Sequence, residues 1–186
     1  MPEIKNKNLL ERLKKDDRNA LKEIFKEHYT MVYRAIYRLI PDVGITEDLA
    51  QDVFMKFWEK RYQIQIDGAV GAYIRRMAIN EALGYLRKHK KYSIEAVEEK
   101  HSPLTRSGED AYMNQELQAE ISKAIETLPP KCKTVFVLSR YEELSYKEIS
   151  QKLAISPKTV ENQISKALKI LKKALKGYLA SLLFFF

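Results

Sequence analysis

The sequence predicts an all-α protein made of two small helical domains that are joined by a flexible linker. Apolar residues recur every three or four positions along most of the 186-residue chain, which is the period of an amphipathic helix. The chain has only 6 Gly and 6 Pro and no long alternation of apolar and polar residues, so strands are not expected. Residues 92–114 are acidic and polar and lack an apolar period, which is typical of a linker.

The same pattern sets the expected domain boundaries. One domain should cover residues 1–91 and a second residues 115–177, and a short hydrophobic tail should follow over residues 178–186. Each domain is small, so each should bury only a modest core.

Composition excludes several classes of function. Cys132 is the only cysteine, so no internal disulfide can form, and the three His lie in separate segments without the spacing of zinc ligands. No nucleophile, base or metal cluster is recognisable, so we expect no catalytic residue, no metal, no cofactor and no small-molecule substrate. The sequence also has no run typical of a signal peptide or a membrane span, and we expect a cytoplasmic protein.

The net charge of +8 is concentrated in two places. Residues 69–91 and residues 115–186 each carry +5, whereas the intervening linker carries −3 and residues 1–68 carry +1. This distribution is typical of a protein that binds a polyanion, although Lys-rich helical faces are as often only solvated.

Residues 45–60, ITEDLAQDVFMKFWEK, should form a helix with Thr46 as its N-cap and two acids in its first turn. Its buried face would be formed by Leu49, Val53 and Phe57. The other side has Gln51, Asp52 and Glu59, with Met55 among them, and forms an acidic and amide surface next to the aromatic ring of Trp58. Such a surface is either solvated or a patch for docking a protein, and the residues alone favour the solvated interpretation.

The next helix, over residues 69–91, combines aromatic, amide and cationic side chains in one stripe. The stripe contains Tyr73, Arg76, Asn80, Arg87 and Lys91, with Gly84 in its gap. Stacking surfaces next to cations suit unpaired bases and their phosphates. The alternative is that the tyrosines of this helix are core residues and that its basic end is only solvated.

A helix-turn-helix is predicted in the second domain. Ser145 and Glu148 form a capping box that starts a short helix, which ends near Ala154. Ser156 then caps a second helix that has Pro157 at its first position. Two helices joined by about three residues make this motif.

The second helix has two opposite faces. At 100° per residue, the apolar face contains Val160, Ile164, Ala167, Leu168, Leu171 and Leu175. The opposite face contains Lys158, Asn162, Ser165, Lys169, Lys172 and Lys176. Such a helix suits a DNA major groove, with Lys on phosphates and Asn on a base edge, but it could also be a surface helix of a bundle.

Four segments occur in a familiar order: EDLAQDVFMKFW, YIRRMAINEALGYLR, ETLPPKCKTVFVLSRYEELSYKEIS and LAISPKTVENQISKAL. Together they resemble the extracytoplasmic-function (ECF) sigma factors, the small promoter-recognition subunits of bacterial RNA polymerase. The resemblance implies a region 2 helical bundle in the first domain and a region 4 helix-turn-helix in the second. It implies that the protein binds core RNA polymerase, directs it to specific promoters and assists promoter melting.

The resemblance also implies roles for individual residues. The surface that docks on polymerase would contain Asp48, Gln51, Asp52 and Trp58. Melting and reading of the minus-ten element as single strand would involve Tyr73, Arg75, Arg76, Asn80, Arg87 and Lys88. Duplex DNA at the minus-thirty-five element would be read by Lys158, Thr159, Asn162, Gln163, Lys166 and Lys169.

Some residues depart from the family pattern. Gly84 replaces an expected Asp, Ala154 replaces a usual Gly at the turn, and Glu161 replaces a residue that is often basic. The last helix looks most like ECF members of Bacteroidetes, many of which work with a membrane-bound anti-sigma factor. We therefore expect an anti-sigma partner, and the hydrophobic tail is predicted to contact that partner or to pack between the domains.

Two other functions are open at this point. A helix-turn-helix regulator could bind DNA without docking on polymerase, but it would not require the acidic-aromatic helix or the first basic stripe. A helical adaptor with no DNA role would lack salt-dependent affinity for DNA.

Overall fold

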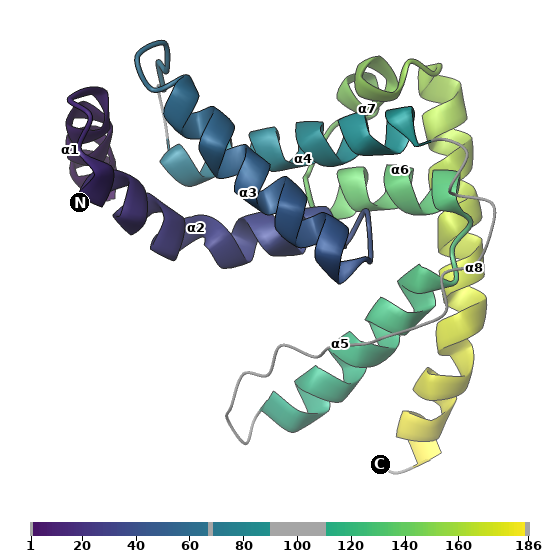
Figure 1. Ribbon diagram of the computed structural model, residues 1–186. Coiled ribbons are helices and arrows are strands. Elements are labelled where there is room, and N and C mark those ends of the chain that lie inside the picture. Colours follow the sequence, from purple (N-terminus) through teal and green to yellow (C-terminus); the bar gives the residue numbers. More distant parts are fainter. Residues whose placement is uncertain (1, 67–68, 90–110, 185–186) are drawn as a thin grey trace. The chain divides into compact units, whose positions relative to one another are not determined.

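The computed structural model describes the backbone of residues 2–66, 69–89 and 111–184, and the side chains of residues 8–66, 69–89 and 119–176. These residues form eight helices and no strand, which confirms the predicted all-α fold (Figure 1). The chain divides into two compact units, residues 1–92 and 93–186. Most of the predicted linker lies outside the described residues.

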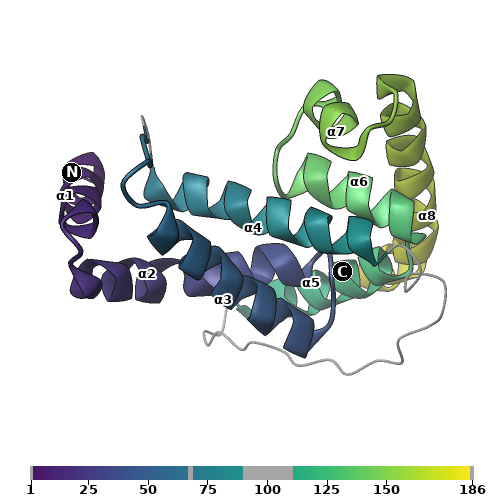
Figure 2. The same cartoon turned by 45° about the horizontal axis from the view of Figure 1, so that its top comes forward.

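The first unit consists of four helices: α1 (Pro2–Lys14), α2 (Arg18–Tyr37), α3 (Val43–Glu59) and α4 (Val70–Lys88). Helices α2, α3 and α4 pack against one another, and α1 packs on α2 (Figures 1 and 2). The carboxylate of Asp17 caps α2 by accepting a 2.8 Å hydrogen bond from the backbone N–H of Asn19. A local cap therefore starts α2, and contacts between the helices hold the unit together.

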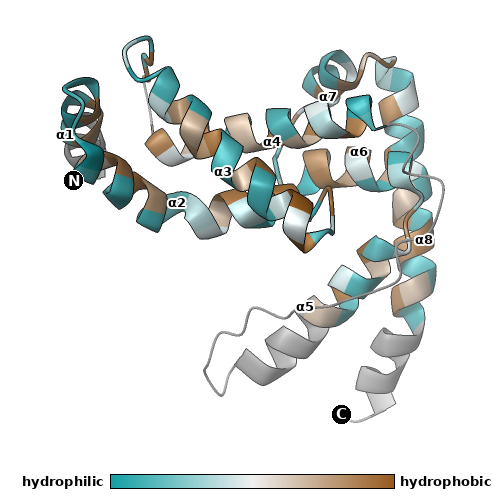
Figure 3. Ribbon diagram, viewed as in Figure 1, coloured by the Kyte–Doolittle hydropathy of each residue, from teal (hydrophilic) through white to brown (hydrophobic). Residues whose placement is uncertain are grey.

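The core of this unit is an apolar stripe from each of the three packed helices. Ile24 and Ile36 of α2, Phe57 of α3 and Ile74 of α4 are fully buried. Burial of a side chain such as that of Phe57 contributes about 1.5–3 kcal/mol. Each of these helices has both apolar and polar stretches of surface, as expected for amphipathic helices (Figure 3).

The predicted start of α3 was wrong. The helix begins at Val43, and its N-cap is Asp42, whose carboxylate accepts a 2.8 Å bond from the Ile45 N–H. Thr46 is buried instead, and its hydroxyl donates to the Ile40 carbonyl oxygen at 3.0 Å. An Asp just upstream therefore capped the helix in place of the Thr, because both residue types suit the role.

The second unit contains α5 (Ala111–Glu126), α6 (Pro130–Arg140), α7 (Tyr146–Leu153) and α8 (Pro157–Phe184). Helix α5 begins inside the segment predicted as linker. Helix α8 packs against the other three helices. The core between α5, α6 and α8 includes Leu128, Cys132 and Phe136. The Cys132 thiol donates to the Gln163 carbonyl oxygen at 3.3 Å, and burial raises its pKa.

The helix-turn-helix has the predicted caps. Ser145 and Glu148 form the capping box of α7, and the Ser156 hydroxyl accepts a 3.0 Å bond from the Thr159 N–H at the start of α8. Between the two helices, Ala154 has a left-handed backbone with φ of 52°. This conformation favours Gly, which is the physical reason that Gly is usual at this turn in the family. Ala154 adopts the same backbone conformation without that advantage.

One residue of α8 differs from the prediction. Leu168 was expected on the apolar face but is 44% exposed, because it lies at the edge of that face. The helix continues to Phe184, so the backbone of the hydrophobic tail is helical up to that residue. The side chains of the tail lie outside the described residues.

Candidate docking and nucleic-acid surfaces

A groove of about 440 Å³ lies between α2 and α3. It is lined by Leu21, Lys22, Phe25, Gln51, Phe54, Met55 and Trp58. Two of the predicted polymerase-docking residues, Gln51 and Trp58, are therefore part of its wall. Phe25 is 40% and Met55 60% exposed, so large apolar side chains face solvent here. An exposed apolar hollow of this kind suits a protein partner.

Phe25 in the wall of the groove is the first ring of an aromatic stripe along α2. Phe25, Tyr29, Tyr33 and Tyr37 follow one another at helical spacing, with centroid distances of 4.9, 6.2 and 5.8 Å between successive rings. Phe54 of α3 closes the stripe with its ring 4.8 Å from that of Phe25. These four rings were not among the predicted functional residues, although their four-residue spacing is visible in the sequence.

The surface of α3 beside the groove is acidic. The predicted docking residues Asp48 and Asp52 are both exposed. Burial raises the pKa of Tyr33, and Tyr37 and the nearby acid Glu47 add to this rise. A partner with apolar side chains flanked by cations would match this aromatic and acidic surface.

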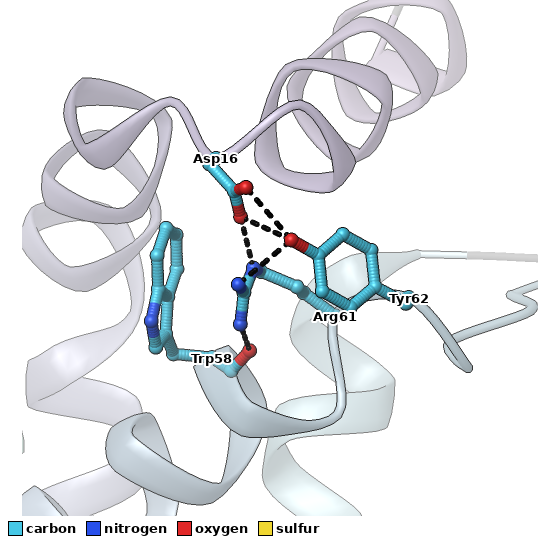
Figure 4. A network of polar contacts seen from close by, with 4 residues as sticks. All are labelled: Asp16, Trp58, Arg61 and Tyr62. Atoms are coloured by element: carbon cyan, nitrogen blue, oxygen red, sulfur yellow. Dashed lines mark hydrogen bonds and ion pairs between the residues drawn. The ribbon is translucent and has the colours of Figure 1, made fainter.

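At the end of the groove, Trp58 belongs to a polar network (Figure 4). The guanidinium of Arg61 lies 4.2 Å from the ring centroids of both Trp58 and Tyr62. Its Nε donates to Oδ1 of Asp16 at 2.6 Å, and the Tyr62 hydroxyl donates to the same carboxylate at 2.6 and 2.7 Å. The Tyr62 and Arg61 hydrogen bonds lower the pKa of Asp16. Asp16 and Arg61 are 45 residues apart, so no local pattern in the sequence predicts their contact.

The predicted minus-ten residues lie along α4. Arg76, Asn80, Arg87 and Lys88 are exposed, and Arg75 is half-buried. Tyr73 is also half-buried, and its ring packs 6.2 Å from that of Phe57. Lys91 lies outside the described residues.

Two further contacts define this helix. The Lys56 ammonium donates to Glu81 at 2.6 Å and ties α3 to α4. A Cβ added at Gly84 would meet no atom within 4 Å, so packing within the protein does not require Gly there. The exposed side of α4 is therefore a cationic and amide surface supported by the other two helices of the bundle.

The predicted minus-thirty-five residues lie on the first half of α8. Lys158, Asn162, Lys166 and Lys169 are exposed, while Thr159 and Gln163 are half-buried. The Thr159 and Ser156 hydroxyls are hydrogen-bonded at 2.9 Å, which links Thr159 to the helix cap. Lys158 donates to Glu161 at 2.8 Å, so an acid lies within the cationic face of the helix.

Among the residues that the structure describes, no group of His, Cys, Asp and Glu could hold a metal ion. Nor is any helix in the described ranges both long and apolar enough to cross a membrane.

Known proteins match both units. The family model for sigma-70 region 2 matches residues 24–92, and that for sigma-70, region 4, matches residues 118–171. The ECF RNA polymerase sigma factor SigW of Bacillus subtilis (strain 168) is 29% identical over 184 residues, which cover 94% of this chain and 98% of SigW. The ECF RNA polymerase sigma-E factor of Escherichia coli (strain K12) is 26% identical over 86% of this chain and 88% of its own length.

Two solved structures share the fold. The sigma factor RpoE from Bartonella quintana, in complex with the anti-sigma factor NepR, aligns with a TM-score of 0.55 and 22% identity over 83% of this chain and 96% of that chain. CnrH in complex with the cytosolic domain of CnrY aligns with a TM-score of 0.54 and 18% identity over 92% and 97%. These structures support the two-domain helical fold.

The fold and both matches define a sigma factor with regions 2 and 4. The chain belongs to the ECF sigma factors, which confirms the predicted resemblance. The family consists of transcription initiation factors and is not a known class of enzymes. The closer resemblance to members from Bacteroidetes stays a prediction.

Proposed function

We propose that this chain binds core RNA polymerase in the cytoplasm, directs it to specific promoters and assists promoter melting. The polymerase supplies the chemistry, and the chain has no catalytic role. The observation that supports this function best is the combination of one groove-bearing region 2 unit with one helix-turn-helix unit in a single chain. A regulator that binds DNA directly would need only the second unit.

The docking role is proposed for the α2–α3 groove and the acids beside it. Gln51 and Trp58 line the groove, and Asp48 and Asp52 lie exposed on the same helix. Large aromatic side chains in a hollow are the residues that carry most binding energy at protein interfaces. Acids next to the groove would direct a basic partner surface onto it.

The minus-ten role is proposed for the exposed face of α4. Its cations, Arg75, Arg76, Arg87 and Lys88, would neutralise phosphates of the separated strand, and Asn80 would pair with a base edge. Tyr73 packs on Phe57 and would support the stacking surface from the protein side. Binding of the unpaired strand by this face would favour the open form of the DNA.

The minus-thirty-five role is proposed for the first half of α8. Asn162 is exposed on the helix, and an Asn there can bond the N6 and N7 atoms of adenine in the major groove. The remaining residues would hold the helix on the backbone or read adjacent bases: Lys158, Thr159, Gln163, Lys166 and Lys169.

An anti-sigma factor is the proposed regulatory partner. The two solved structures described above are complexes, one with the anti-sigma factor NepR and one with the cytosolic domain of CnrY. An anti-sigma factor that covered the α2–α3 groove would compete directly with polymerase.

Run-off transcription with core polymerase tests the proposal. The template is the DNA upstream of the chain's own gene, and the variants are Arg76→Ala and Asn80→Ala. Lys14→Ala, which removes one positive charge from α1, is the matched control. We expect chain-dependent transcripts that fall about tenfold or more with either α4 variant, since each removes an interaction worth about 1–3 kcal/mol, and that persist with the control. Binding to duplex DNA without any binding to polymerase would instead establish an ordinary helix-turn-helix regulator.

A further inference from the structure

The side chain of Trp58 lines the groove and also touches a residue outside it. The Arg61 guanidinium lies 4.2 Å from the centroid of the Trp58 ring, and its Nη1 donates to the Trp58 carbonyl oxygen at 2.9 Å. Trp58 therefore has contacts from Arg61 to both its ring and its backbone (Figure 4). A cation over an indole face is a favourable contact that also restricts how the ring can turn.

Arg61 is itself held in place. Only 16% of its side chain is exposed, and it lies between the rings of Trp58 and Tyr62. Its Nε donates to Asp16, and its Nη2 donates to the Tyr62 hydroxyl at 2.9 Å. A planar guanidinium can stack on two rings and donate sideways at the same time, which an ammonium cannot do.

Asp16 lies in the turn between α1 and α2, and this turn is well defined. Asp16 has a φ of 62°, and its N–H donates to the Leu13 carbonyl oxygen at 3.1 Å. The neighbouring Asp17 accepts a 2.8 Å bond from Arg12, which also reaches Glu23 of α2 at 3.0 Å. The carboxylate that holds Arg61 thus comes from a turn that is fixed to both of its helices.

We infer that Asp16 and Arg61 are positioning residues for the polymerase-docking groove, because together they fix the orientation of Trp58 at its end. The inference rests on the proposed function and deepens it. Asp16 lies before the region 2 match, which begins at residue 24, so the docking surface depends on a residue outside the matched segment. An oriented indole binds more tightly than a mobile one, because less side-chain freedom is lost on binding.

Fluorescence of the full-length chain tests the positioning step, since Trp58 is the only Trp. The variants are Asp16→Asn, which tolerates the left-handed backbone, and Arg61→Lys, which keeps the charge. Glu11→Gln is the control, because it removes one acid from the exposed side of α1. We expect both variants, but not the control, to increase acrylamide quenching of Trp58 and to lower its anisotropy. Unchanged quenching in both variants would overturn the inference.

Affinity for purified core polymerase tests the consequence. We expect Asp16→Asn and Arg61→Lys to weaken binding about fivefold to twentyfold. When Trp58→Ala is already present, Asp16→Asn should change the affinity less than about twofold, because Asp16 acts on binding through the orientation of Trp58. Equal effects of Asp16→Asn in both backgrounds would show that it acts elsewhere and would overturn the inference. If Trp58→Ala itself left the affinity unchanged, the docking role proposed for Trp58 would be wrong. If Trp58→Ala weakened binding but Asp16→Asn and Arg61→Lys left it unchanged, the positioning role would be overturned and the docking role of Trp58 would stand.

Discussion

The two units of the chain hold their functional surfaces by different means. In the helix-turn-helix, Ser145 bonds Glu148 and Ser156 bonds Thr159, so each bond spans only three residues. In the first unit, Asp16 bonds Arg61 across 45 residues and Lys56 bonds Glu81 across 25. The comparison indicates that local caps start the two helices of the helix-turn-helix, whereas the docking groove and the α4 face depend on contacts between distant parts of the bundle.

The largest expected effect comes from the core of the first unit. Phe57 is fully buried between α3 and its neighbours, and Phe57→Ala should reduce the free energy of unfolding of this unit by about 3–5 kcal/mol. Denaturant unfolding followed by circular dichroism measures the loss. Because the second unit has a core of its own, the amide NMR signals of α7 should keep their chemical shifts in this variant. Loss of the α7 signals together with the first unit would show that the two units do not differ in the way described.

A smaller and opposite effect is expected at the turn of the helix-turn-helix. Ala154 has a φ of 52°, which costs an L-residue about 1–2 kcal/mol relative to Gly. Ala154→Gly should therefore stabilise the second unit by about 1 kcal/mol, as measured by its thermal unfolding midpoint. A lower unfolding midpoint in Ala154→Gly would mean that the left-handed backbone at this position does not limit the stability of the helix-turn-helix.

The smallest expected effect concerns the charge on the recognition helix. Glu161 lies among its cations and binds Lys158, so Glu161→Gln should free the ammonium and remove a repulsion from phosphate. Affinity for a duplex carrying the minus-thirty-five element should rise about threefold at low salt and less at high salt. Fluorescence anisotropy of labelled DNA checks this, with Glu59→Gln of α3 as a matched control. A larger rise in the control would contradict the role of the α8 face.

The same difference explains what could be predicted from the sequence. The capping box at Ser145 and the Ser156 cap were predicted correctly because their partners lie within one helical turn. Thr46 was wrong as an N-cap because only packing decides between it and Asp42. Leu168 was wrong because its angle places it at the border between core and solvent.

The site was predictable in the same uneven way. Gln51 and Trp58 were identified by resemblance, but the groove that joins them to Phe25 on α2 requires the packing of two helices. The contact of Asp16 with Arg61 joins a turn to the end of a distant helix, and no local pattern predicts it. The residue types on the surface of α3 could be predicted from the sequence, whereas the groove between α2 and α3 could not.

In the function proposed here, one chain uses α8 on duplex DNA and α4 on the opened strand. Footprinting of the complex of core polymerase, chain and promoter tests it directly, with DNase protection reporting the minus-thirty-five element and permanganate reporting unpaired thymines near the minus-ten element. We predict that Arg76→Ala loses the permanganate signal while the upstream protection remains, and that Asn162→Ala weakens the upstream protection first. Loss of both signals together in each variant, or opening of the DNA without the chain, would contradict the account.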